Sequence, residues 1–440
     1  MHRCDIFEIS DVSAFYPLNP RQLRSINFLP VNVAIIGAGA AGCFCALQLK
    51  RRLPEAQVDV YEGGSKALAK VAITGGGRCN LTNTFRDIRS LQEAYPRGAQ
   101  LMKRAFCQFD HEATMRWFEA EGVALTVQDD QCVFPRSQDA MQIVNTLLRG
   151  MERAGVGLHL RHKVSRIEPL ATTDYEICFM ADAPAVRADI VIVTTGGSPR
   201  PQGLDFLAPL ALKIEPPVPS LFSFNISGMS DLMGIVANAV SVRLAGTKFR
   251  ADGVLLITHW GMSGPAILKL SSHAARHLAE VNYRAQLIVN WLADATEDDA
   301  RLLIEQMQRG EGGKLVANAR PSQIPSRLWL SLTRRAGLRP DQRWSEVGRK
   351  QMNRLASILT ADTYPIEGQS RHKEEFVTCG GISLNELNLN TLATKKHPNL
   401  YLAGEVLDVD AITGGFNLQA AWSMAYVVAN GIVQKASAMQ

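Results

Sequence analysis

The chain has 440 residues, of which 46% are hydrophobic and 20% are charged. This length allows two or three domains, and the composition is that of a folded globular protein, which excludes a disordered or collagen-like chain. The 47 Lys and Arg residues exceed the 42 Asp and Glu residues only slightly, for a net charge of +5, and no block of like charges occurs. We interpret this excess as ordinary surface solvation and expect no nucleic-acid partner.

The sequence carries no recognisable targeting, membrane or metal signal. Its longest apolar stretches are shorter than the ~18 residues that a bilayer span requires, or are broken by glycine, so we expect no membrane contact. Residues 1–29 lack the apolar core of a secretory signal, and we expect them to form an N-terminal extension of a cytoplasmic protein. The eight cysteines form no C-x-x-C pair and the nine histidines no ligand-type spacing, so we expect no metal site.

The first part of the chain is typical of a β-α-β unit. Residues 31–36 form an apolar, β-branched run, as expected for a strand buried on both faces of a parallel sheet. Helix-forming residues follow over 40–52, and a second strand is predicted over 58–61. The patterns further along predict helices over 99–121 and 138–153, and strands over 131–135, 157–167, 175–180 and 190–193. The expected fold class is α/β, with a Rossmann-like doubly wound unit.

A cluster of prolines at 216–219 marks a change of pattern. Beyond it we expect an inserted domain, 216–372, with β-rich segments over 216–268 and 357–372 and a small helical subdomain over 269–356. The sheet-like pattern returns over 373–440. The first domain is therefore expected to be discontinuous, built from 30–215 and 373–440.

The strongest local motif is Gly37-Ala38-Gly39-Ala40-Ala41-Gly42, between the first strand and the first helix. Gly37 permits a tight turn, Gly39 allows the backbone to approach a pyrophosphate, and Gly42 allows close packing of helix and strand. Glu62 follows at the end of the second strand, where a carboxylate accepts hydrogen bonds from ribose hydroxyls and disfavours a 2'-phosphate. This context predicts a dinucleotide site, and a small-residue packing face is the alternative.

Two further glycine-rich elements point to a longer ligand. The first, 74–83, holds three successive glycines beside an Arg and two Asn, which permits a backbone that passes close to a flat ring or a phosphate. The second follows a strand over 400–403 and contains Gly404, Glu405 and a Gly414-Gly415 turn that opens the last helix. The alternatives are a flexible loop for the first element and a simple helix-capping turn for the second.

Seven motifs resemble, in the same order, those of a known family. They are IIGAGAAG (35–42), ITGGGRCNLTN (73–83), VFPRS (133–137), TTGGSPRPQG (194–203), THWGMSGPAIL (258–268), VTCGGISLNEL (377–387) and YLAGEVLDVDAITGGFNLQAAW (401–422). On these residues the chain resembles the BaiN/YhiN-like flavoproteins, also described as aminoacetone-oxidase-type FAD-binding enzymes. The resemblance covers nearly the whole chain from residue 31 on, and it implies a Rossmann-like FAD-binding domain in two segments with an inserted β-rich and helical region.

The resemblance also implies which residues contact FAD. They lie in the glycine-rich elements and at the ends of the predicted parallel strands: Gly37, Ala38, Gly39, Ala41, Gly42, Glu62, Lys70, Gly76, Gly77, Arg78, Cys79, Asn80, Thr195, Gly196, Gly404, Glu405, Asp408, Gly415, Phe416, Asn417 and Leu418. Val164 is added as the residue whose backbone would meet the adenine.

No catalytic residue is assigned, and two candidates are weighed. Cys79 would lie near the isoalloxazine ring, where it either tunes the flavin or fills space in a glycine loop. The nearest cysteines in sequence are too distant for a redox pair. His259 joins a strand to a helix in the inserted domain and is either an acid/base or a structural histidine.

These motifs and the resemblance predict an FAD-dependent oxidoreductase that transfers a hydride between flavin N5 and a small organic substrate or NAD(P)H. If NAD(P)H is the reductant, it must dock transiently in the same cleft, because a second G-x-G-x-x-G motif is missing. Three alternatives stay open: an amine oxidase that uses oxygen, a flavin-dependent RNA-modifying protein, and a non-catalytic FAD-binding protein. Substrate identity and oligomeric state are left open.

Overall fold

The computed structural model of the chain describes residues 31–438 apart from 172, 181–182, 199 and 371–376. The chain forms two compact units, one from residues up to Pro217 together with those from Thr378 on, the other from Val218–Val377. The sequence placed these boundaries at 215/216 and 372/373. The predicted N-terminal extension, 1–29, lies outside the described residues.

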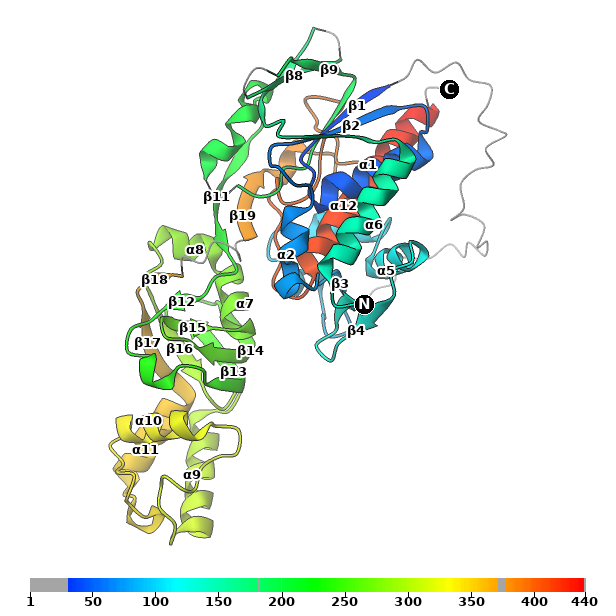
Figure 1. The fold of residues 1–440 in the computed structure, drawn as a ribbon. Helices are drawn as coiled ribbons and strands as arrows, with labels where there is room; N and C mark the ends of the chain where they lie inside the picture. The colour runs from blue at the N-terminus through cyan, green and yellow to red at the C-terminus, as the bar shows by residue number, and fades with distance from the viewer. Residues whose placement is uncertain (1–30, 172, 181–182, 199, 371–376, 439–440) are drawn as a thin grey trace. The chain divides into compact units, whose positions relative to one another are not determined.

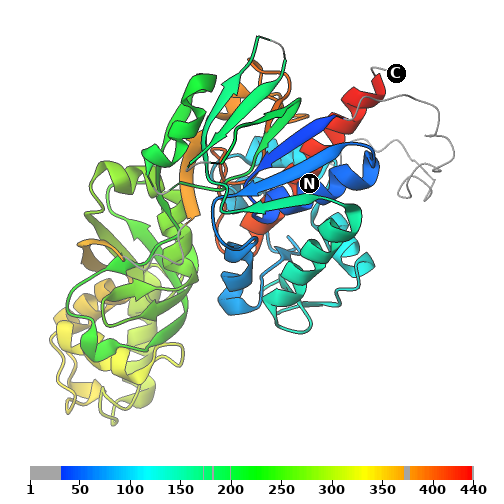
Figure 2. The ribbon, with the colours of Figure 1, turned by 45° about the horizontal axis from the view of Figure 1, so that its top comes forward.

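A five-stranded parallel sheet forms the centre of the first unit (Figures 1 and 2). Its strand order is β20 (Leu400–Leu402), β10 (Ile190–Val193), β1 (Asn32–Ile36), β2 (Gln57–Glu62) and β6 (Gly157–Leu160). The chain moves from β1 to β2 on one side and later adds β10 and β20 on the other. The middle strand β1 is therefore the point where the strand order reverses, which in open parallel sheets is where ligands bind.

The apolar runs 31–36 and 190–193 of the sequence form the middle strand β1 and its neighbour β10. Val33–Ile36 of β1 and Val191–Val193 of β10 are buried, and Ile35 lies opposite Ile192 in the register. Burying each such side chain stabilises the fold by about 1.5–3 kcal/mol. The predicted α/β class with a Rossmann-like parallel sheet is confirmed.

Three helices pack together beside this sheet, and they come from distant parts of the chain. Helix α1 contacts both of the others, as Figures 1 and 2 also show; the three are α1 (Ala40–Arg52), α6 (Ala140–Ala154) and α12 (Phe416–Ala438). The approach of α6 to α1 depends on Gly150, because a Cβ added there would lie 2.8 Å from Cδ2 of Leu47.

Shorter elements complete the first unit. They are two three-stranded antiparallel sheets, β7 (Val164–Pro169), β8 (Tyr175–Phe179), β9 (Val186–Ala188) and β3 (Thr82–Asn83), β5 (Cys132–Pro135), β4 (Leu125–Val127), the helices α2 (Ala69–Gly77), α3 (Leu91–Ala94), α4 (Ala99–Phe106) and α5 (His111–Ala120), and the 3-10 segments η2 (Pro201–Leu210) and η6 (Leu384–Glu386). The single helix predicted over 99–121 is wrong, since Asp110 caps a new helix by accepting a hydrogen bond from Ala113 N at 2.8 Å.

The second unit contains a seven-stranded sheet whose paired strands are antiparallel. Its order is β17 (Asp362–Ile366), β16 (Ala285–Asn290), β13 (Val236–Leu244), β14 (Arg250–Ile257), β15 (Gly261–Ser263), β12 (Phe224–Asn225) and β18 (Gly368–Gln369). Its helical segments are α7 (Pro265–His273), α8 (Ala275–Glu280), α9 (Glu297–Glu311), α10 (Ser326–Arg335), α11 (Arg349–Ala361), η3 (Ser230–Leu232) and η4 (Trp344–Glu346). The chain passes between the units along β11 (Ile214–Ser220) and β19 (Val377–Ile382), which pair with each other.

The inserted region differs from the prediction at β16. This strand lies inside the stretch predicted to be helical, 269–356, and pairs with both β13 and β17. Its residues alternate, with Leu287 and Val289 buried on one face, which is the period of a half-buried strand. The predicted boundary at 356 also differs, because α11 continues to Ala361.

Within the described part of the chain, no helix is both long enough and apolar enough to cross a membrane.

Substituting Phe44, a central side chain of α1, tests the packing of the first unit. Phe44 is fully buried. The centre of its ring lies 4.7 to 6.5 Å from the ring centres of Phe109, Trp117, Phe118 and Trp422. We expect Phe44→Ala to lower the free energy of unfolding by about 3–5 kcal/mol, because it leaves a cavity. Urea unfolding followed by tryptophan fluorescence measures this. The exposed Met141→Ala is the control, and an equal loss in both variants would contradict the packing described.

Candidate cofactor site

The turn after β1 lies against the end of β10, with no room for side chains. A Cβ added at Gly37, where φ is +104°, would lie 2.7 Å from Thr194 O. One added at Gly42 would lie 2.0 Å from Gly37 O. The Thr194 hydroxyl donates to Gly37 O at 2.9 Å and so fixes the turn. These two glycines are therefore required by the backbone approach itself.

Gly39, unlike Gly37 and Gly42, faces open space, because a Cβ added there would have no atom within 4 Å. Gly39 is the N-cap of α1, and the first turn of this helix carries no acidic residue. The unpaired amides and the helix dipole make such a terminus a site for an anion. The open space in front of a capping glycine fits a pyrophosphate.

Glu62 is fixed at the end of β2, beside the same turn. Its Oε2 accepts a hydrogen bond from Ala38 N at 2.9 Å, and its Oε1 accepts one from Gly64 N at 2.7 Å. His162 N donates to Glu62 O at 2.8 Å, and this places Val164, at the start of β7, two residues from that contact. A carboxylate held this way retains lone pairs for ribose hydroxyls.

The ends of β10 and β20 complete the rim around β1. A Cβ added at Gly196 would lie 3.9 Å from Oε2 of Glu405, and one added at Gly404 would lie 3.2 Å from Cβ of Ala41. Oε2 of Glu405 also lies 3.7 Å from Lys70 Nζ. Thr195 is adjacent, since a Cβ added at Gly37 would lie 2.9 Å from its Cα. The structure thus brings these predicted residues to the carboxyl ends of neighbouring parallel strands.

The second glycine-rich segment lies against the start of α12, although the two are far apart in sequence. Thr82 Oγ1 donates to Gln419 Oε1 at 2.6 Å, across 337 residues, and Trp422 Nε1 donates to Leu81 O at 3.1 Å. The Asn80 amide donates to Thr82 O at 3.0 Å and accepts from Gly415 N at 3.1 Å in the orientation that satisfies both groups. The two motifs predicted to share one ligand are therefore side by side.

The loop that precedes α12 is held by hydrogen bonds to Asn417, to Tyr95 and to the backbone of β19. Asn417 Oδ1 accepts from Ala411 N at 3.0 Å, while its Nδ2 donates to Ala411 O at 3.1 Å. Tyr95 donates its hydroxyl to Phe416 O at 3.0 Å. Leu418 lies in the first turn of α12, and Asp408 N donates to Ile382 O at 3.0 Å. These bonds define the backbone path from 408 to 418.

Gly76 and Gly77 expose an open stretch of backbone. Their φ values are +69° and +82°, and a Cβ added at either would have no atom within 4 Å. Arg78 follows, with its guanidinium 4.5 Å from the centre of the Phe134 ring and its Nε donating to Gly75 O at 3.1 Å. This is the accessible backbone that a flat ring or a phosphate requires.

The two candidate catalytic residues have different surroundings. Cys79 is fully buried, and this burial raises the pKa of its thiol to about 12, although a hydrogen bond with Thr74 acts in the opposite direction. Its thiol is therefore protonated at neutral pH. His259 belongs to the second unit, where its exposed ring lies edge-on to Trp260 at 4.4 Å. Both roles stay predictions.

Sequence reasoning missed three contacts that shape the site. Thr194 fixes the glycine turn, Gln419 connects α12 to β3, and the buried carboxylate of Asp410 forms an ion pair with Arg97. Only Thr194 had a local signal, as the polar residue that ends a buried strand. The other two contacts join residues more than 300 positions apart, which no local pattern reveals.

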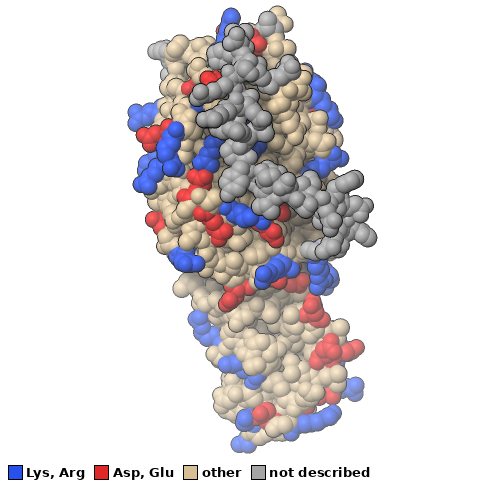
Figure 3. Space-filling model, turned by 90° about the vertical axis from the view of Figure 1, so that its right-hand side faces the viewer, with Lys and Arg blue, Asp and Glu red and all other residues tan. Residues whose placement is uncertain are grey.

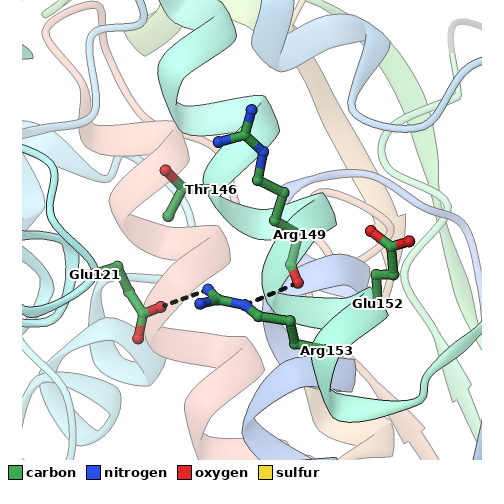
Figure 4. A pocket seen from close by; sticks show the side chains of 5 residues that line it. All are labelled: Glu121, Thr146, Arg149, Glu152 and Arg153. Carbon is green, nitrogen blue, oxygen red and sulfur yellow. Dashed lines mark hydrogen bonds and ion pairs between the residues drawn. The ribbon is translucent and has the colours of Figure 1, made fainter.

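A separate surface hollow lies between α6 and the end of α5 (Figure 4). It is lined by charges of both signs and contains none of the predicted cofactor residues; its lining is Glu121, Thr146, Arg149, Glu152 and Arg153. Arg153 Nη2 lies 4.0 Å from Glu121 Oε2, and Arg153 Nε donates to Arg149 O at 3.2 Å. Among the described residues, no group of His, Cys, Asp and Glu is placed to hold a metal ion.

Comparison with known proteins assigns the fold. The family model described as the HI0933-like protein Rossmann domain matches residues 31–431. The chain belongs to this family. HI0933-like proteins of this type are FAD-dependent oxidoreductases, so the cofactor is FAD. The open space at Gly39 and the hydrogen-bonded Glu62 carboxylate fit that molecule.

Two curated relatives align with almost the whole of this chain. One, named ribosomal RNA dihydrouridine synthase, from Escherichia coli, is 28% identical over 91% of this chain and 97% of its own. The other, named 3-dehydro-bile acid delta(4,6)-reductase, from Clostridium scindens, is 26% identical over 92% of this chain and 99% of its own. Among solved structures, 3-ketosteroid delta1-dehydrogenase from Sterolibacterium denitrificans aligns with a TM-score of 0.49 at 11% identity, covering 92% of this chain and 99% of that one.

Gly39→Asp separates cofactor binding from folding. An Asp is a favourable helix N-cap and meets no clash here, so we expect the empty protein to keep its stability. Like charges about 4 Å apart repel by about 4 kcal/mol at an effective dielectric constant of ~20, so FAD affinity should fall by about two to three orders of magnitude.

Flavin absorbance per protein and thermal unfolding of the empty protein measure these two effects. Gly348→Asp is a matched control, because Gly348 is also a helix N-cap with no atom within 4 Å of an added Cβ. Full flavin content in Gly39→Asp would contradict this placement of the pyrophosphate.

The protonated state of Cys79 predicts its reactivity. With a thiol pKa of about 12, Cys79 should stay unmodified by iodoacetamide at pH 8, whereas the exposed Cys107 reacts. Reactivity of Cys79 should rise only as the pH approaches 12 or when the protein unfolds. Peptide mass spectrometry after alkylation distinguishes the two cysteines. Equal labelling of both at pH 8 would show that Cys79 is accessible and ionised.

Proposed function

We propose that this chain uses FAD to reduce a carbon–carbon double bond conjugated to a carbonyl group, with the uracil ring of an RNA as the first candidate substrate. The relatives' names support this reaction class. Dihydrouridine differs from uridine by two hydrogens across C5–C6, which is conjugated to the C4 carbonyl. The delta(4,6) bonds of a 3-dehydro-bile acid are conjugated to its C3 ketone.

FAD, when bound, would supply hydride transfer: a hydride taken from a reductant such as NAD(P)H would add to one carbon of the activated double bond, and a proton from water would add to the other. The described residues would hold and orient the cofactor. The amides at the start of α1 would bind the pyrophosphate, and Glu62 would accept hydrogen bonds from the ribose hydroxyls. The hydrogen bonds between β3 and α12 would fix the backbone that surrounds the ring.

The same comparison supports the direction of hydride transfer that we propose. Both relatives are named for reactions that yield a more saturated product, and these names favour the reductase over the amine oxidase that the sequence left open. NAD(P)H as the electron source is part of the proposal. An RNA substrate departs from the expectation of no nucleic-acid partner, which was based on the net charge of the whole chain.

A small conjugated ketone is the second candidate substrate. The relative named for a bile-acid reductase supports it, with nearly the same identity and coverage as the RNA-modifying relative. The two candidates share the reaction and differ in the size and charge of the substrate, so one assay with two substrates distinguishes them.

Anaerobic rapid mixing of the FAD-loaded protein tests the reaction. NADH or NADPH should bleach the flavin absorbance, whereas a panel of amines should not. The reduced protein should then be reoxidised without oxygen by unmodified ribosomal RNA, with the mass of a uridine increased by two hydrogens, or by a steroid 4,6-dien-3-one. Bleaching by an amine alone, with peroxide formed on admission of oxygen, would contradict the proposal.

A further inference from the structure

The positive charge of the chain is concentrated in one stretch of the second unit. Between Arg309 and Arg354 there are eleven Lys and Arg residues and three Asp and Glu residues, a net charge of +8. The rest of the chain holds 36 basic and 39 acidic residues, a net charge of −3. On the face drawn in Figure 3, charges of both signs are interspersed. The small net charge of the whole chain therefore conceals a strongly basic segment.

Several of these cations lie on α10 and α11, two helices that contact each other. Gln351 Nε2 donates to Gly337 O at 2.8 Å, and a Cβ added at Gly337 would lie 4.0 Å from Arg354 Nη1. Arg334 is three residues before Gly337, and Lys350 shares a helix face with Arg354 at an i, i+4 spacing. Arg334, Lys350 and Arg354, together with Arg349, define what we call the α10–α11 surface.

The cations of the α10–α11 surface are exposed and lack acidic partners. Within the part of the chain that the structure describes, none of the four lies within ion-pair distance of a carboxylate. Nearby basic residues differ, since Arg335 pairs with Asp362 and Arg309 with Glu305. Charges that are exposed and unneutralised are available to an anionic partner.

The basic stretch, all of which the structure describes, presents no exposed aromatic ring to a partner. The two aromatic residues of the stretch, Trp329 and Trp344, are both fully buried. Their ring nitrogens donate to Val316 O at 2.8 Å and to Ala319 O at 3.2 Å. A partner held here would be bound through charge and not by stacking of bases on side chains.

The residue types favour a phosphate backbone over other anionic partners. Nine of the eleven basic residues are Arg, whose planar guanidinium binds phosphate oxygens in pairs. A membrane surface usually requires exposed apolar side chains beside the basic ones. Among the described residues, no large exposed hydrophobic side chain lies between 309 and 354. A protein partner usually binds around buried aromatic anchors, which this stretch does not present.

We propose that the α10–α11 surface binds the phosphate backbone of RNA. This inference rests on the proposed function, in which an RNA is the first candidate substrate, and it adds the part of the molecule that would hold the RNA independently of its sequence. Because such contacts release counterions, binding should weaken steeply as salt is raised.

Fluorescence anisotropy of the FAD-loaded full-length protein with a fluorescein-labelled, uracil-containing RNA tests this surface. The triple variant Arg334→Gln/Lys350→Gln/Arg354→Gln should bind at least about tenfold more weakly at ~100 mM KCl. Three lost phosphate contacts should lower the slope of log affinity against log salt by about two, at ~0.7 per contact on a single strand.

The matched control removes the same number and types of charge from the first unit. Arg89→Gln/Lys103→Gln/Arg187→Gln changes exposed residues, and it should leave RNA affinity within about twofold of the wild type. Flavin absorbance shows that the first unit of each variant is folded, and circular dichroism during thermal unfolding shows that the second unit is folded as well. An equal loss in both triple variants, or no loss in the first, would overturn the proposal.

Two further measurements separate this inference from the proposed function. If the first triple variant loses binding to phosphatidylglycerol vesicles but not to RNA, or if the wild type binds no RNA, the α10–α11 surface is not an RNA site. Reduction of the steroid dienone by the wild type would then still support the reaction class. If RNA binds through this surface but neither substrate is reduced, the proposed function fails while the surface stands.

Discussion

The close approach of the β1–α1 turn to the end of β10 is the constraint on which the cofactor site depends. Gly37 and Gly42 leave no space for a side chain between the turn, the strand and the helix. This contact brings the start of α1 to the point where the strand order of the parallel sheet reverses. Glu62 and the residues that follow β10 and β20 lie at the same edge of the sheet. A binding site for an extended dinucleotide follows from this packing, because each strand end contributes one part of it.

The long-range contact between β3 and α12 brings together the other segments that we predict to contact the cofactor. The hydrogen bonds of Thr82 with Gln419 and of Trp422 with Leu81 O are buried, where a polar group without a partner is costly. They therefore hold two segments in register that the chain separates by more than 300 residues. Gly76 and Gly77, where an added Cβ would have no atom within 4 Å, come just before this held segment in the chain.

The sequence predicted what depends on local sterics and failed on what depends on distant partners or local averages. The glycine motifs were informative because a glycine with positive φ or a blocked Cβ position leaves few alternatives, as at Gly37 and Gly415. The pairs Thr82–Gln419 and Arg97–Asp410 had no local signal. The helix break at Asp110 was missed because the apolar spacing continues across this N-cap, and the strand β16 was missed because it lies between two helical stretches. The basic stretch at 309–354 was present in the sequence and was concealed by averaging over the whole chain.

Hydrogen exchange of the protein with and without FAD tests the central claim most directly. We expect FAD to slow exchange together in three separate segments, 37–43, 76–83 and 404–419, because one molecule would contact all of them. Protection of the first segment alone would contradict it, since the cofactor would then be held by the β1–α1 turn without the support of β3 and α12.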